Sequence, residues 1–178
     1  MNTFIALLRG INVSGQKKVP MVELRSLLSD LGLKNVQTYI QSGNVIFQSS
    51  EENRTALENL IQKAILSHFG FEVPVLVRTA TEIKDILDAC PFLEEKKMNG
   101  YFTLLHSAPD TSLIKETHLI SYPNEEFHIT SQCVYFYSTS GYGNAKCNNN
   151  FFERKLKIDA TTRNYKTIVK LLSLCAEN

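Results

Sequence analysis

The order of helical and strand patterns in the first 79 residues restricts the fold of this chain more than any other feature. The run Phe4–Leu8 is apolar at every position, which is typical of a strand buried on both faces. Apolar stripes at helical spacing and β-rich runs then follow in turn. The helical stripes span residues 20–31 and 57–68, and the β-rich runs span residues 36–47, as a hairpin, and 72–77. The order β-α-β-β-α-β defines the ferredoxin-like split βαβ unit.

Short polar signals predict where these elements begin and end. Ser49 with Glu52, and Thr79 with Glu82, match the capping-box pattern, in which two side chains satisfy the first free N–H groups of a helix. Within the hairpin, Ser42-Gly43-Asn44 predicts the turn, because glycine takes positive φ without steric cost and asparagine tolerates it.

The second half of the sequence follows a similar order. Residues 101–106 predict a strand, Asp110 caps a short helix, and residues 126–138 predict a second hairpin. When the first hairpin is moved by 89 residues onto the second, five of ten positions are identical, from Ile40 with Ile129 to Ser49 with Ser138. The charged stretch 91–100 is expected to connect the halves as a loop, and residues 160–164 are expected to break the chain before a last helix.

We therefore predict an α+β protein with two ferredoxin-like halves, each an antiparallel sheet with helices packed on one face. Residues 1–79 are the first predicted subdomain, and residues 80–178 are the second, which includes the C-terminal helices.

Composition excludes several classes of protein. With 43% hydrophobic residues and a net charge of +1, the chain resembles neither a disordered acidic protein nor a strongly basic nucleic-acid binder. It has no basic segment followed by an apolar run at its start and no apolar stretch of about 20 residues, so we expect a cytoplasmic protein without membrane contact. The four cysteines form no C-x-x-C pair and are expected to be reduced and structural.

Positive charge gathers near the two ends of the sequence. Residues 1–50 carry five Lys/Arg against two Asp/Glu, and residues 144–178 carry seven against three. If these ends fold next to each other they make one basic face; otherwise the charges belong to separate solvated helix faces.

The stretch Leu8–Lys18 carries the strongest chemical signal. It leaves a buried strand, enters a helix, and contains two glycines, an arginine, an asparagine and two adjacent lysines. Such a connection can present backbone N–H groups and cations to an anion. The spacing of Gly10 and Gly15 lacks the Gly-Lys-Ser/Thr core of a phosphate-binding loop, so ATP hydrolysis has little support.

The predicted anion-binding set combines this loop with polar residues elsewhere in the chain. Its members are Arg9, Asn12, Lys17, Lys18, Asn44, Lys146, Arg163 and Asn164. Arginine offers a planar fork to phosphate and lysine adds a mobile charge. The best prediction is a binding module for a phosphate-bearing small molecule or a nucleic acid, without a defined catalytic site.

Two alternatives remain open. A small enzyme acting on an anionic substrate would use Arg9 and Arg163 as clamps, with Gln41 or Ser42 as polar groups. A structural or regulatory protein would use the same motifs only to shape loops. The sheet aromatics Tyr135, Phe136 and Tyr137 invite comparison with RNA-binding sheets, although the matching consensus is missing. The histidines and cysteines have no metal-ligand spacing, so neither a metal nor a cofactor is expected.

Three motifs carry a resemblance to a known family. Leu8-Arg9-Gly10-Ile11-Asn12-Val13, Thr38-Tyr39-Ile40-Gln41-Ser42-Gly43-Asn44-Val45 and Ala160-Thr161-Thr162-Arg163-Asn164-Tyr165 resemble the bacterial domain-of-unknown-function family DUF1697. Ser14 stands where that family usually has glycine, and Tyr165 stands where it usually has tryptophan. The resemblance implies a cytoplasmic bacterial protein with a duplicated ferredoxin-like fold. It implies no activity, so catalytic residues stay unknown.

Overall fold

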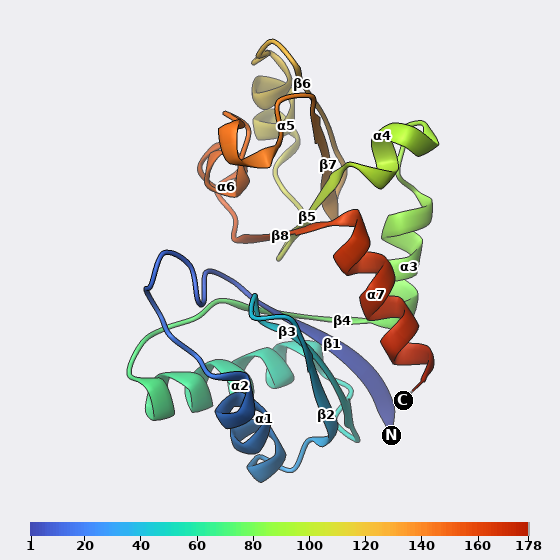
Figure 1. The fold of residues 1–178 in the computed structure, drawn as a ribbon. Coiled ribbons are helices and arrows are strands. Elements are labelled where there is room, and N and C mark those ends of the chain that lie inside the picture. The colour runs from blue at the N-terminus through green and yellow to red at the C-terminus, as the bar shows by residue number, and fades with distance from the viewer. Residues whose placement is uncertain (178) are drawn as a thin grey trace. The chain divides into compact units, whose positions relative to one another are not determined.

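The computed structural model describes residues 1–177 and contains two four-stranded antiparallel sheets (Figure 1). The first sheet is formed by β1 (Asn2–Leu8), β2 (Lys34–Tyr39), β3 (Asn44–Ser49) and β4 (Val75–Thr79), with α1 (Met21–Asp30) and α2 (Arg54–Phe69) in the connections. Its strand order is β2-β3-β1-β4, and every neighbouring pair is antiparallel. This is the ferredoxin-like arrangement predicted from the sequence.

The second sheet repeats the same topology. It is formed by β5 (Tyr101–Leu105), β6 (Glu125–Ile129), β7 (Cys133–Ser138) and β8 (Ala160–Asn164), with α5 (Thr111–His118), the short helix η1 (Tyr142–Asn144) and α6 (Asn149–Leu156) in the connections. Its order is β6-β7-β5-β8, and all of its pairs are antiparallel. The predicted fold class, two ferredoxin-like halves, is confirmed.

Three further helices complete the described chain. They are α3 (Ala80–Asp88), α4 (Glu94–Met98) and α7 (Tyr165–Ala176). Contacts divide the chain into two compact units, one of residues 1–84 with the segment that begins at Lys170, the other of residues 85–169. The division between residues 79 and 80 stays a prediction. No helix in residues 1–177 is long and apolar enough to span a membrane.

The core of the first unit confirms the interpretation of its first strand. Every residue of Phe4–Leu8 is buried. On one face Phe4 packs with Phe47 of β3, with ring centroids 5.7 Å apart, against the leucines and isoleucines of α1 and α2. Ile5 and Leu7 on the other face are fully buried as well.

The core of the second unit is aromatic. On the helix-covered face of its sheet, Phe136 of β7 packs edge to face with Phe152 of α6, with centroids 6.3 Å apart. On the other face Phe102 packs edge to face with Tyr135 at 5.6 Å. The Tyr135 hydroxyl donates to the backbone oxygen of Ile86 at 2.8 Å, which satisfies a phenol that is almost wholly buried.

Three local predictions were wrong. The helix α2 is capped by Asn53, whose side chain accepts from Ala56 N at 3.1 Å, and not by a capping box of Ser49 and Glu52. The predicted loop 91–100 contains the one-turn helix α4, whose first turn is acidic and whose last turn is basic, as the helix dipole favours. Residues 160–164 are the edge strand β8 rather than a break, because the adjacent Thr161 and Thr162 suit an extended chain.

The capping box of Thr79 and Glu82 at the start of α3 is confirmed. Glu82 N donates to Thr79 Oγ1 at 3.2 Å, and Thr79 N donates to Glu82 Oε2 at 2.9 Å. Partial burial opposes ionisation of Glu82, but the Thr79 hydrogen bonds and the Arg54 guanidinium outweigh it and hold the pKa of this carboxyl below its usual value.

Glu82→Gln is expected to weaken the pH dependence of stability in the acid range. A carboxyl whose pKa is lower in the folded state stabilises the fold at pH values above its unfolded-state pKa. This contribution is lost as the pH falls through the folded-state pKa. The variant keeps the capping hydrogen bond but has no charge to titrate. Urea unfolding at pH 7 and at pH 3 measures the difference, and Glu52→Gln, outside any capping box, is the control. If Glu82→Gln lost as much stability between pH 7 and pH 3 as the unmodified protein does, the assignment would be contradicted.

The two units protect the same edge of their sheets in the same way. Glu58 of α2 accepts a hydrogen bond from Val77 N of β4 at 2.8 Å, and Glu153 of α6 accepts one from Ala160 N of β8 at 3.0 Å. Both strands are edge strands, so these N–H groups have no neighbouring strand as partner. In each unit a helix carboxylate therefore accepts one N–H group of this edge strand.

Candidate functional site

The connection between β1 and α1, residues 9–20, folds into a small hairpin of its own. Ser14 (φ +50°) and Gly15 (φ +75°) form its turn, and Gln16 N donates to Val13 O at 2.9 Å. Positive φ at both central residues defines a type I′ turn, the form that suits a two-residue hairpin. Asn12 N donates to Lys17 O at 3.1 Å and extends the hairpin by one more bond. The loop therefore has a defined conformation.

Asn12 fastens this hairpin to the rest of the unit. Its side-chain oxygen accepts from Val19 N at 2.8 Å, and its Nδ2 donates to Val19 O at 3.0 Å and to Gln41 O at 2.8 Å. Its φ of +55° is one that asparagine adopts more readily than most residues. The polar atoms of the side chain are thus occupied within the protein, and the residue shapes the loop.

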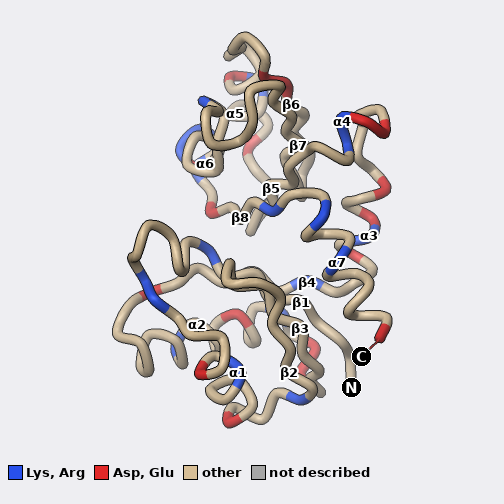
Figure 2. Tube along the Cα trace, in the orientation of Figure 1, with Lys and Arg blue, Asp and Glu red and all other residues tan. Residues whose placement is uncertain are grey.

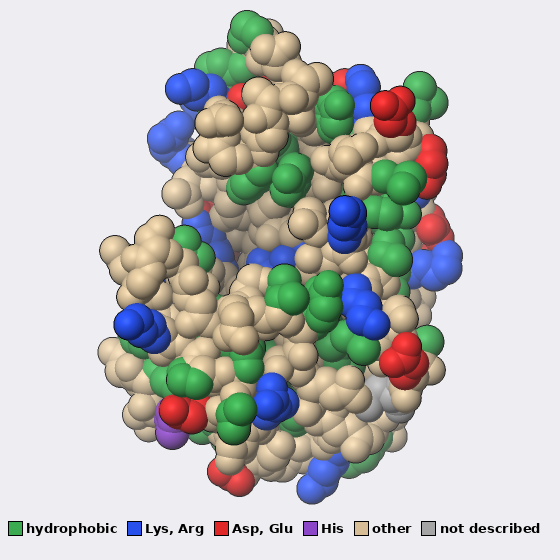
Figure 3. All heavy atoms as spheres, in the orientation of Figure 1, with side chains coloured by type: hydrophobic (Ala, Val, Ile, Leu, Met, Phe, Trp, Pro, Cys, Tyr) green, Lys and Arg blue, Asp and Glu red, His purple; other side chains and the backbone are tan. Residues whose placement is uncertain are grey.

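The basic residues of the loop differ in their surroundings. Lys17 is exposed, and its Nζ donates to the backbone oxygen of Glu72 at 2.7 Å, which holds one side of the hairpin. Lys18 is exposed, and the structure gives its ammonium no partner among residues 1–177. Arg9 is half-buried at the end of β1, where its N–H donates to Pro74 O at 3.0 Å. Figure 2 shows the basic segment in this connection, and Figure 3 shows basic side chains at the surface over it.

The turn between β2 and β3 lies against the base of the loop. A Cβ added to Gly43 (φ +80°) would lie 2.6 Å from Leu8 Cβ and 3.0 Å from Ile11 Cδ1, so only glycine fits there. Asn44 is fully buried, and its Nδ2 donates to Tyr39 O at 3.1 Å and Ser42 Oγ at 2.9 Å. The predicted turn is therefore present, and Asn44 stabilises it from inside.

Ile40 departs from the predicted strand. Strand β2 ends at Tyr39, and Ile40 has a φ of +51° with 51% of its surface exposed. A β-branched residue in this region of φ is strained. Its neighbour Gln41 receives the Asn12 hydrogen bond, so the exposed isoleucine lies next to the anchored loop.

The remaining predicted residues belong to the second unit. Asn164 caps α7, since its Oδ1 accepts from Thr167 N at 2.9 Å. Lys146 is exposed in the connection between β7 and α6, and its N–H donates to Glu125 Oε1 at 2.7 Å. Arg163 is half-buried on β8 and donates to Thr162 O at 2.9 Å. The predicted set is thus divided between two compact units, and a backbone hydrogen bond joins two of its members, Asn12 and Lys17, in the first.

Arg163 has an equivalent in the first unit that the sequence did not single out. Arg163 pairs with Phe102 of β5, and Arg78 pairs with Ile5 of β1 at the matching place in the other sheet. Burial lowers the pKa of Arg163 to about 10, although the Tyr142 phenol opposes it, and burial lowers the pKa of Arg78 as well. Arg78 lies 3.7 Å from Glu58 Oε1. The sequence signal that could have identified Arg78 is the pattern it shares with Arg163: an arginine one residue before a capping Thr or Asn.

The sheet aromatics do not form a base-stacking platform. Tyr135 is 2% exposed and Phe136 is fully buried, so neither ring face can receive a nucleobase in the folded unit. Tyr137 is half-buried with Lys96 Nζ 5.7 Å from its ring centroid. The comparison with RNA-binding sheets was wrong for Tyr135 and Phe136. Successive side chains of β7 point to opposite faces of the sheet, so one of these rings lies in each buried layer.

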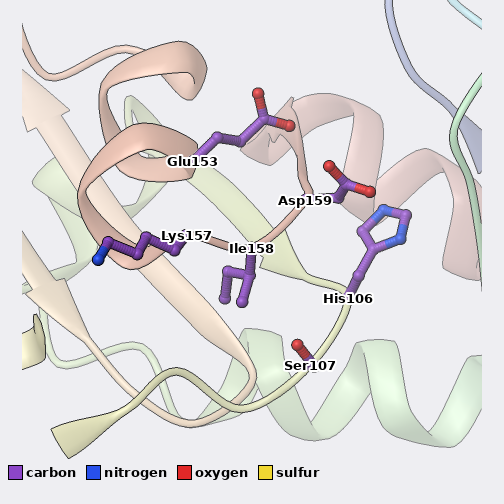
Figure 4. Close-up of a pocket in the computed structure, with 6 residues that line it drawn as sticks. All are labelled: His106, Ser107, Glu153, Lys157, Ile158 and Asp159. Carbon is purple, nitrogen blue, oxygen red and sulfur yellow. The ribbon is translucent and has the colours of Figure 1, made fainter.

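A shallow hollow lies in the second unit, at the end of β5 (Figure 4). It has a volume of about 440 Å³. Its walls come from the short β5–α5 connection, the end of α6 and the residues before β8. They are His106, Ser107, Glu153, Lys157, Ile158 and Asp159. Sequence reasoning missed this place, because no motif marks it. In the part of the chain that the structure describes, no group of His, Cys, Asp and Glu side chains could hold a metal ion.

The class of fold is thus two ferredoxin-like units in tandem, and the first unit carries an anchored basic loop. Residues 1–135 match the family described as "Protein of unknown function (DUF1697)", and the chain belongs to that family. The solved structure of the conserved bacterial protein SP0830 from Streptococcus pneumoniae is similar, with a TM-score of 0.75 and 24% identity over 97% of this chain and 98% of that one. This likeness supports the fold. No curated protein matches the chain.

Proposed function

We propose that the protein is a binding module for a phosphate-bearing ligand, a nucleotide or a nucleic acid, and that the loop of residues 9–20 is the contact site. The observation that carries the proposal is the anchored hairpin itself. Asn12 and Lys17 fix its base, while Lys18 and the turn at Ser14 and Gly15 stay exposed. A loop that is already ordered loses little conformational entropy when a ligand binds.

The chemistry of the exposed part suits an anion. The structure gives the backbone N–H groups of Ser14 and Gly15 no hydrogen-bond acceptor among residues 1–177, and the Lys18 ammonium can reach solvent freely. Lysine ammonium and backbone N–H groups are common phosphate donors. Lys17 uses one donor for Glu72 O and keeps further N–H bonds for a ligand.

Lys18→Ala is expected to lower the affinity for such a ligand about tenfold, the effect of one lost charge-assisted hydrogen bond. Isothermal titration calorimetry of the whole chain with inorganic phosphate, ATP and a single-stranded oligonucleotide measures it. Affinity is also expected to fall as salt rises, most steeply for the oligonucleotide.

Lys63→Ala is the matched control. Lys63 is an exposed lysine of α2 in the same unit, so the variant has the same change in net charge. It is expected to bind as the unmodified protein does. Equal losses in both variants would show nonspecific attraction, and absence of saturable binding to all three probes would refute the proposed function.

A further inference from the structure

The turn between β2 and β3 holds Ile40 in an exposed and strained position. Its φ is +51°, which β-branched residues rarely adopt, and 51% of its surface is exposed. Asparagine side chains fix the chain on both sides of it. Tyr39 O accepts from Asn44 Nδ2 at 3.1 Å. Gln41 O accepts from Asn12 Nδ2 at 2.8 Å. Backbone strain that the surrounding structure maintains in this way is concentrated at ligand-binding sites.

This turn is longer than its counterpart in the second unit. In the second unit Ile129 pairs with Val134, the second residue of β7, and four residues lie between them. In the first unit Thr38 pairs with Val45, the second residue of β3, and six residues lie between them. The additional residues belong to the segment 39–44, which contains the strained isoleucine.

The connection that follows β1 is also longer than the one that follows β5. It has twelve residues, 9–20, whereas the other has five, 106–110. Both lengthened segments lie at the same end of the first sheet (Figure 1). They contact each other, because the Asn12 amide of one segment donates to Gln41 O of the other. The first unit therefore has a surface here that is built from two lengthened connections.

This surface presents apolar, amide and cationic side chains together. Val13 follows Asn12 and is 58% exposed, and the exposed Ile40 precedes Gln41. The Gln41 side chain is exposed, and the structure gives its amide no partner among residues 1–177. Lys18, in the same loop as Val13, is exposed as well. A nucleotide carries the matching groups: apolar ring faces, a ring edge with donors and acceptors, and an anionic phosphate.

We propose that the loop site contacts the nucleobase of its ligand as well as the phosphate. The ring lies against Ile40 and Val13, and the Gln41 amide forms hydrogen bonds with the ring edge. Proteins that bind single bases cover them with apolar or aromatic side chains, and a carboxamide both donates and accepts as a base edge does. This inference rests on the proposed function. It narrows the ligand to nucleotides and nucleic acids, against phosphate compounds that have no base.

Calorimetry of the whole chain with ATP, UTP and inorganic tripolyphosphate tests the base contact. Tripolyphosphate has the same phosphate chain without a nucleoside. At least one of the two nucleotides is expected to bind about tenfold more tightly than tripolyphosphate. Equal affinities for the three compounds would overturn the base contact and leave the phosphate site standing. Absence of binding to all three would refute the proposed function, and the base contact with it.

Ile40→Gly is expected to lower the affinity for the preferred nucleotide about fivefold and to leave that for tripolyphosphate unchanged, because it removes apolar surface but no charge. Glycine accepts the φ of +51°, so the fold should persist, which thermal unfolding checks. Val13→Ala is expected to act in the same direction. Leu66→Ala on α2, where the side chain is also exposed, is the control and should change neither affinity. If Ile40→Gly and Val13→Ala left nucleotide binding unchanged, or weakened tripolyphosphate binding equally, the proposal would be overturned.

A single-stranded oligonucleotide and an abasic strand of the same length distinguish the two sources of a base. The abasic strand is expected to bind more weakly, and equal affinities would contradict the base contact. Tighter binding of the oligonucleotide than of either nucleotide would identify nucleic acid as the ligand. Tighter binding of a nucleotide would identify the free nucleotide.

Discussion

Gly43→Ala is expected to lower the free energy of unfolding by about 3 kcal/mol. The added methyl group would meet Leu8 Cβ at 2.6 Å and Ile11 Cδ1 at 3.0 Å, so the turn or strand β1 must shift. The φ of +80° adds backbone strain for any residue with a Cβ. Urea unfolding followed by circular dichroism measures the loss. Both contacts lie at the base of the loop, so the proposed phosphate binding should weaken as well.

Gly15→Ala separates these two causes. Gly15 has a similar φ of +75°, but nothing lies within 4 Å of an added Cβ. Gly15→Ala is therefore expected to lower the free energy of unfolding by only about 1 kcal/mol, the cost of the strained backbone. If the two variants lost equal stability, the close packing at Gly43 would have no energetic role.

Asn12→Ala is expected to cost about 3 kcal/mol of stability. The side chain makes three hydrogen bonds, and without it Val19, which is 1% exposed, would keep a buried N–H group without an acceptor. The same variant should also abolish the affinity of the loop for phosphate ligands, because the hairpin loses its anchor. Thermal unfolding and calorimetry on the same sample measure both effects.

Asn12→Gly tests whether the hydrogen bonds or the backbone cause the loss. Glycine accepts the φ of +55° without strain but provides no side-chain bonds. If the bonds dominate, this variant should lose most of the stability that Asn12→Ala loses. Near-normal stability in Asn12→Gly would assign the effect to backbone strain.

The sequence predicted the fold because its strongest patterns are the ones that bury most surface. The apolar run Phe4–Leu8 is a strand buried on both faces, and the stripes of α1 and α2 lie against it. Strand β8 was missed because its alternation is short and polar, with Thr161 buried and Arg163 half-buried at a sheet edge. Its pairing with β5 comes from tertiary contacts that no local pattern contains.

The sequence predicted the loop that carries the candidate site, but not the contacts of its side chains. The loop after β1 is where the sequence put it, yet Asn12, Asn44 and Asn164 each use a side-chain amide within the protein. A polar side chain in a motif gives no sign of whether its partner is a ligand or a backbone group. The hollow at His106 could not be foreseen, because no motif marks the residues that line it.

The helix carboxylates at the edges of β4 and β8 have a consequence for how the protein behaves in a crowded solution. An edge strand with free N–H groups is a template on which a strand from another molecule can add, which leads to aggregation. At Val77 and Ala160 such a strand would meet a negative carboxylate in the place of a free donor. Glu58 and Glu153 therefore oppose the addition of a further strand at the β4 edge and at the β8 edge.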